Sequence, residues 1–181
     1  MKVVFKSGRR DASLLTLGLA LAACGSGTSS DDAGNMFVAY ASTFQPFRTW
    51  TSFQHDLEDS SLPAGVNGPR TQYLNMAPPH GSTEFPVGTV IVESRESGTM
   101  NIFAGVKRGG GYNSTGAKNW EWFELAEASG PGSTVSIVWR GLGPPPGDQY
   151  GGDANTCNTC HTTCGGGNDY VCSPYLQLAG F

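Results

Sequence analysis

The sequence carries little charge. Only 14% of its 181 residues are Asp, Glu, Lys or Arg, and the formal net charge is −4. An acidic chain of this kind lacks the basic surface that a nucleic-acid backbone requires, so no nucleic-acid partner is expected. The apolar run near the N-terminus, LLTLGLALAA at residues 14–23, is too short to span a bilayer. No internal repeat is visible, and the length fits a single domain.

Glycine, proline and aromatic residues are plentiful instead. The chain has 26 Gly and 11 Pro, and 10% of it is aromatic, a mixture typical of short strands joined by turns. Alternating apolar residues predict strands, and their short links favour antiparallel pairing. We therefore predict a mainly β (α+β) fold, an antiparallel meander with a few short helices near residues 36–46 and in the C-terminal tail from Pro174. The predicted strands cover residues 70–75, 87–95, 99–108, 119–127 and 134–140.

Two of these strands would place chemically interesting side chains on one surface. Ile91 and Glu93 share one face of their strand, and Phe103 and Gly105 share one face of the next. A hairpin turn at 96–98 would bring both sets together. A small residue such as Gly105 makes room for a ligand or marks a bulge.

The N-terminal segment is typical of a targeting signal. Basic residues precede the apolar run, which ends in LAAC at Leu21–Cys24. This ending is similar to the bacterial lipoprotein signal, in which the cysteine is lipidated. We therefore expect a signal peptide at 1–23, a flexible tether at 24–35 and one domain at 36–181, in an exported protein anchored to a membrane and facing the periplasm. Gly25, which follows the lipidated Cys24, is compatible with sorting of the lipoprotein to the outer membrane. The alternative is ordinary secretion, with Cys24 merely near the cleavage site.

The remaining four cysteines lie close together in NTCNTCHTTCGGGNDYVCSP, residues 155–174. Within it, Cys157, Cys160 and His161 form C-x-x-C-H, the attachment pattern of c-type haem. Two thiols three residues apart can reach the two vinyl groups on one haem edge, and the adjacent histidine can then ligate the iron. The pattern predicts one covalently attached haem c with His161 as proximal ligand.

The other two cysteines flank a flexible stretch. Cys164 and Cys172 are separated by GGGNDYV, and an exported protein can keep disulfides, so we predict that they pair. Two alternatives remain open. All four cysteines could hold a structural zinc ion, or the four could form two disulfides with His161 incidental.

The order of motifs resembles that of the cytochrome P-460 family, which includes the cytochromes c′-beta. The pieces that carry the resemblance over residues 46–181 are PRTQYLN, FPVGTVIVES, FAGVKRGGGYNSTGAKNWEWFEL, CNTCH and DYVCSPYLQL. The resemblance implies an antiparallel β fold around one c-type haem, often in a homodimer. It also implies His161 as the proximal ligand.

The resemblance further divides the family by what surrounds the haem. Hydroxylamine-oxidising members carry a cross-linking lysine where this chain has Glu93, and a distal carboxylate where it has Phe103. Arg70 matches an arginine of the family's pocket. These matches imply a member of the c′-beta type, whose apolar distal side binds NO or CO. For each of the three residues an ordinary structural role stays open: core packing for Phe103, and a solvated strand position for Glu93 and Arg70.

Other functions also stay open. The chain could be an enzyme that oxidises hydroxylamine or nitric oxide, with Lys107 as a conceivable cross-linking residue. It could be a periplasmic electron-transfer cytochrome with a redox partner, in which Met76 or Met100 is the sixth ligand. It could also be an exported domain without haem, whose cysteines are structural.

Overall fold

The computed structural model describes residues 34–55, 68–95, 102–146 and 156–181. The predicted signal peptide, Cys24 and the predicted turn at 96–98 lie outside the described residues. Within the described ranges, no helix is both long enough and apolar enough to cross a membrane.

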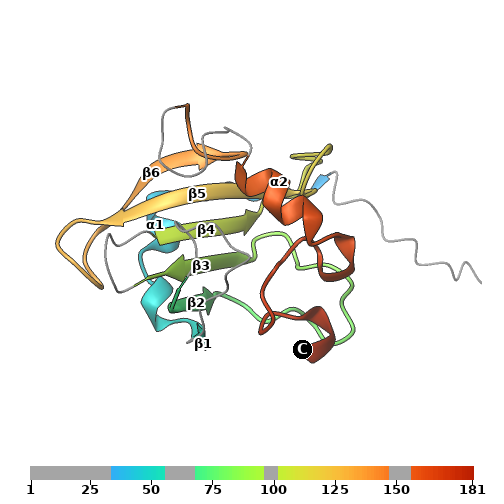
Figure 1. The fold of residues 1–181 in the computed structure, drawn as a ribbon, viewed down its shortest axis with the longest axis horizontal. Helices are drawn as coiled ribbons and strands as arrows, with labels where there is room; N and C mark the ends of the chain where they lie inside the picture. The colour runs from blue at the N-terminus through green and yellow to red at the C-terminus, as the bar shows by residue number, and fades with distance from the viewer. Residues whose placement is uncertain (1–33, 56–67, 96–101, 147–155) are drawn as a thin grey trace, which may run out of the picture. The chain divides into compact units, whose positions relative to one another are not determined.

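The centre of the fold is one antiparallel sheet of six strands, arranged in chain order from β1 to β6 (Figure 1). This arrangement confirms the mainly β fold that the sequence predicts. All five predicted strands are present, four with shorter bounds and the fifth shifted by one residue. β1 is an additional strand that the polar stretch TSFQH did not suggest. The strands are β1 (Thr51–His55), β2 (Arg70–Leu74), β3 (Val90–Ser94), β4 (Ile102–Lys107), β5 (Trp120–Glu127) and β6 (Val135–Gly141).

Alternating side chains give the sheet two apolar faces, and each is covered by a different part of the chain. The first, which we call the N-terminal face, packs against α1 (Ala41–Phe44) and the 3₁₀ turn Phe47–Thr49. Its core contains Phe44, Phe47, Tyr73, Val90, Val92, Ile102, Ala104, Val106, Phe123, Leu125 and Val135.

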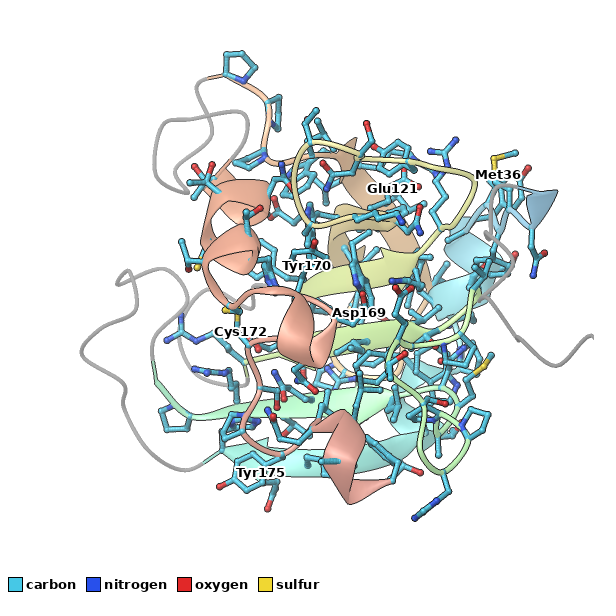
Figure 2. The ribbon with its side chains drawn as sticks, turned by 90° about the vertical axis from the view of Figure 1, so that its right-hand side faces the viewer. Met36, Glu121, Asp169, Tyr170, Cys172 and Tyr175 are labelled. Carbon is cyan, nitrogen blue, oxygen red and sulfur yellow. A yellow bond between two sulfur atoms is a disulfide. The ribbon has the colours of Figure 1, made fainter. Side chains whose placement is uncertain are left out.

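The second, which we call the C-terminal face, is covered by α2 (Thr156–Thr163) and the segment that follows it to Phe181. Figure 2 shows Asp169, Tyr170, Cys172 and Tyr175 in succession along this segment. The core of this face contains Leu74, Phe85, Ala117, Trp120, Trp122, Trp139, Val171, Leu176 and Leu178. The predicted C-terminal helix is only a 3₁₀ turn, Leu178–Gly180, and it does not begin at Pro174.

A β-bulge reverses the alternation of side chains part of the way along β6. Ile137 pairs with Leu125 and Trp139 with Glu124, which leaves Val138 as the extra residue of β6. Val138 is exposed, at 56% of its surface. The insertion reverses the alternation, so Ile137 packs on the N-terminal face while Trp139 packs on the C-terminal face.

Candidate functional site

Helix α2 carries the three chemical groups of the CNTCH motif. Cys157, Cys160 and His161 are spaced three and four residues apart, and these positions are neighbours on a helix surface. Cys157 is half-buried and packs against the core of the C-terminal face, while Cys160 is exposed. Both are thiols, because the disulfide among the described residues joins the predicted pair, Cys164 and Cys172. A zinc site built on all four cysteines would require that disulfide to be absent.

The imidazole of His161 is held through one of its two nitrogens. Nδ1 lies 2.8 Å from the carbonyl oxygen of Tyr170. Since a carbonyl oxygen only accepts, Nδ1 carries the hydrogen and Nε2 keeps its lone pair. Burial lowers the pKa of His161, and the hydrogen bond to Tyr170 opposes that change. The result is a neutral imidazole with Nε2 as its donor atom, which is the form that ligates a metal.

An aromatic stack supports this imidazole from the sheet. The ring of His161 lies 4.0 Å from the ring of Trp122, with 27° between their planes. Trp122 in turn stacks on Trp120 at 6.0 Å and 10°. The indole Nε1 of Trp122 is buried and has no hydrogen-bond partner in the described part of the chain. A buried indole N–H usually has an acceptor, so this donor is available to a group bound beside α2.

Gly105 makes that stack possible. A Cβ atom added to Gly105 would lie 2.8 Å from Cζ3 of Trp122 and 3.4 Å from Cε3 of Trp120. Both distances are shorter than the usual separation of about 3.5–4.0 Å between carbon atoms. Of the two roles considered for Gly105, room for a ligand or a bulge, the structure shows neither. The residue makes room for a tryptophan side chain.

The carbonyl that holds His161 belongs to a tight turn. Asp169 and Tyr170 both adopt left-handed backbone conformations, with φ of 50° and 64°. Each is unfavourable for a residue with a side chain, by roughly 1–2 kcal/mol. Backbone hydrogen bonds from Tyr170 N to Gly165 O (2.9 Å) and from Asp169 N to Gly166 O (3.1 Å) close the turn.

A buried ion pair attaches the same turn to the sheet. Lys107 Nζ lies 2.6 Å and 2.7 Å from the two carboxylate oxygens of Asp169. Burial raises the pKa of the Asp169 carboxyl, and the ammonium group of Lys107 opposes that rise. Lys107 was the conceivable cross-linking residue, and its ammonium group is instead engaged by Asp169, with Glu84 3.6 Å away.

Asn158, a variable position of the motif, fastens the start of α2. Its side-chain oxygen accepts hydrogen bonds from Asn113 Nδ2 (2.5 Å) and from the backbone N–H of Ala117 (2.9 Å). Its own backbone N–H donates to the carbonyl oxygen of Leu142 (3.2 Å). Gly116 lies so close that any Cβ atom there would collide with the Asn158 amide. The only local indication of this role is the preference of asparagine for local backbone hydrogen bonds.

Two of the three predicted distal residues, Glu93 and Phe103, lie in one row across the C-terminal face, and Arg70 lies two residues before the row's Gln72 on β2. The register pairs Gln72 with Glu93, Glu93 with Phe103, and Phe103 with Glu124. Phe103 is half-buried against the same core cluster as Cys157 and Trp122. The structure therefore brings Glu93 and Phe103 together as predicted. It adds Glu124, a second carboxylate beside Phe103 that no sequence motif indicates.

Glu93 belongs to a polar network. Arg70 Nε lies 3.2 Å from Glu93 Oε2, and the side chain of Gln72 donates to the same oxygen at 3.0 Å. Burial raises the pKa of Glu93, and the charge of Arg70 opposes the rise. Gln72 Oε1 accepts from Ser173 (2.5 Å) and lies 2.8 Å from Nε2 of His55. His55 ends β1 and is 6% exposed.

Of the two possible sixth ligands, Met76 and Met100, the structure describes only Met76. Met76 is 41% exposed just after β2, and Met100 lies outside the described residues.

Comparisons of the chain with protein-family models, curated proteins and solved structures return no significant match.

Proposed function

We propose that the chain is a lipid-anchored c-type cytochrome with one covalently bound haem, which binds a small ligand such as NO or CO. The observation that carries the proposal is the state of His161. Its Nδ1–H donates to a backbone carbonyl, Nε2 keeps its lone pair, and two thiols lie on the same helical surface. Metal-ligating histidines commonly donate their other N–H to such a carbonyl.

In α2, the two cysteines and the histidine would hold the haem in different ways. The thiols of Cys157 and Cys160 would each add across one vinyl group, with sulfur bonding one carbon and hydrogen going to the other. Nε2 of His161 would supply the proximal ligand. When bound, haem supplies an iron that takes up small ligands and exchanges one electron.

The surroundings of α2 fit such a group. The buried indole N–H of Trp122, stacked on His161, has no acceptor in the described ranges. A carboxylate at the edge of a haem could accept from it. Cys157 packs against an apolar cluster on the same face, which would cover part of a flat apolar ring.

The binding of a small ligand rests on the row that contains Phe103. The resemblance to the cytochromes c′-beta assigns Phe103 to an apolar distal side and Glu93 to the place of the cross-linking lysine. Phe103 is half-buried on the same face as α2, and Arg70 pairs with Glu93. A phenyl group cannot donate a hydrogen bond to bound oxygen, which favours simple binding over oxygen activation.

The first experiment asks whether haem is attached. The full chain would be produced with c-type maturation, and a pyridine haemochrome spectrum and the intact mass would be recorded. We expect one c-type haem, which is lost in Cys157→Ala/Cys160→Ala. The matched control, Cys164→Ala/Cys172→Ala, removes the same number of thiols and should keep it. A wild-type chain without haem would refute the proposal.

The second experiment asks what the iron binds. Ferrous protein titrated with CO or NO should show a new absorption spectrum at one ligand per haem. A six-coordinate ferrous protein that binds neither gas would refute a ligand-binding site. It would favour electron transfer, with Met76 or Met100 as axial ligand. A peptide mass that reveals an additional lysine–haem bond would favour the oxidation of hydroxylamine or nitric oxide instead.

A further inference from the structure

We propose that the buried ion pair between Lys107 and Asp169 positions the imidazole of His161 and sets how strongly that imidazole donates electrons to a bound metal. The inference rests on the proposed function, since it concerns the residue that would ligate the iron. It depends on a continuous chain of contacts from β4, through one turn, to Nδ1 of His161.

The first contact is between β4 and the C-terminal segment. Lys107 and Asp169 are 1% and 2% exposed, and both carboxylate oxygens contact the ammonium group, at 2.6 Å and 2.7 Å. Bringing two charges out of water is costly, and an apolar pair of similar volume is often at least as stable. The pair therefore needs an explanation other than stability, and the position of Asp169 supplies one.

The second contact fixes the turn that follows. Oδ2 of Asp169 accepts from the backbone N–H of Phe85 at 2.9 Å, and its carbonyl oxygen accepts from Nε1 of Trp120 at 2.8 Å. Side chain and main chain of Asp169 are thus both attached to other elements. These contacts offset the strain of the consecutive left-handed conformations at Asp169 and Tyr170. Figure 2 shows the two residues side by side in the C-terminal segment.

The third contact reaches the histidine. With Asp169 fixed, the carbonyl group of Tyr170 accepts from Nδ1 of His161 at 2.8 Å. Such a bond fixes the tautomer and orientation of a ligating histidine and increases its basicity. A more basic imidazole stabilises ferric over ferrous iron. Loss of the ion pair should therefore loosen the turn, weaken this bond and favour the reduced state.

The test variant removes both charges without leaving one of them alone. Lys107→Met/Asp169→Asn eliminates the ion pair, and the asparagine oxygen can still accept from Phe85 N–H. Breaking only one partner would leave an uncompensated buried charge, with a large loss of stability that would obscure the result.

The chain offers a matched control pair at a distance from α2. Arg48 Nε and Nη2 contact the carboxylate of Glu127 at 2.8 Å and 2.7 Å, and Glu127 also accepts from the backbone N–H of Gly132 at 2.7 Å. Arg48→Met/Glu127→Gln therefore makes the same chemical change around a carboxylate with the same kinds of partner. Arg48 lies in the 3₁₀ turn that covers the N-terminal face.

The readouts are a redox titration and the iron–histidine stretching frequency of the haem-loaded full chain. For Lys107→Met/Asp169→Asn we expect the equilibrium constant for reduction to rise about tenfold, which is about 59 mV for one electron, and the stretching frequency to fall. The control should change that constant less than about twofold. An unchanged constant and frequency, or an equal change in the control, would overturn the inference.

Two further measurements keep the inference separate from the proposed function and from misfolding. If wild-type protein carries no haem, the proposed function fails, and ¹⁵N NMR of His161 in the haem-free full chain decides the inference. The Nδ1–H tautomer should dominate in the wild type and be lost in the double variant; its retention overturns the inference. If the double variant does not fold, Trp120→Phe is tested in its place, because it removes one hydrogen bond to Asp169. We then expect the equilibrium constant for reduction to rise and the iron–histidine frequency to fall. No change in these two quantities, or a change in the opposite direction, would overturn the inference.

Discussion

Gly105 allows the packing between the sheet and His161 to be tested by a single methyl group. In Gly105→Ala the new Cβ would lie 2.8 Å from Cζ3 of Trp122. An ordinary carbon contact is about 3.5–4.0 Å, so the indole ring must move by roughly 0.7 Å or more. Such overpacking costs about 1–3 kcal/mol. The moved ring is the one that stacks on His161 at 4.0 Å.

The assay is denaturant unfolding of the full chain, followed by tryptophan fluorescence and, for haem-loaded protein, the iron–histidine frequency. Gly167→Ala is the matched control, because a Cβ there meets no atom within 4 Å. We expect the control to change the free energy of unfolding by less than about 0.5 kcal/mol, and Gly105→Ala to lower it by about 1–3 kcal/mol with altered fluorescence. Equal stability and unchanged fluorescence in the two variants would refute the described packing around Gly105.

Three further predictions concern other contacts of the site. Asn158→Ala should lower the free energy of unfolding by about 1–3 kcal/mol, because two donors lose their acceptor, whereas Thr159→Ala, at the other variable position of the motif, should have little effect. Burial raises the pKa of Glu93 above its ordinary value of 4.5. The unfolded chain therefore loses this proton at lower pH than the folded chain, and the free energy of unfolding should fall as pH rises above 4.5. Glu93→Gln should reduce this dependence on pH in denaturant titrations at several pH values, and an unchanged dependence would contradict the described burial. Cys164→Ala/Cys172→Ala should lower the free energy of unfolding by about 2–3 kcal/mol, and wild-type protein treated with reductant should match it; no effect of reductant would contradict a stabilising disulfide.

The sheet was predictable because its strands alternate strongly. Val90–Ser94 and Ile102–Lys107 alternate between the two cores, and the links from β3 to β4 and from β5 to β6 are too short for parallel crossovers. β1 was missed because Thr51–His55 contains one large apolar residue and pairs at the edge of the sheet. There the backbone partner, rather than hydrophobic pattern, decides the conformation.

The site was predictable only in part, because its chemistry is local but its support is not. Cys157, Cys160 and His161 form a motif within one helical turn, so their spacing alone indicates the chemistry. Lys107 and Asp169 are 62 residues apart, and neither local sequence indicates that these two residues form an ion pair.

The bulge shows the same limit within one strand. An uninterrupted alternation would place Trp139 with Ile137 on the N-terminal face, but the extra residue Val138 reverses it. The sequence contains no glycine or proline that would mark this position in β6. Register irregularities of this kind depend on the partner strand, here at Glu124 and Leu125.

The way the two faces are covered also has a consequence in time. The N-terminal face is closed by residues that precede β1, so its partner is already made when the strands emerge during synthesis. The C-terminal face is closed by residues that follow β6, and α2 reaches the sheet only after every strand has been made. Until then its tryptophans lack their cover, and the thiol of Cys157, which is half-buried in the folded chain, remains exposed. Closure of this face is therefore a late event in the life of the chain.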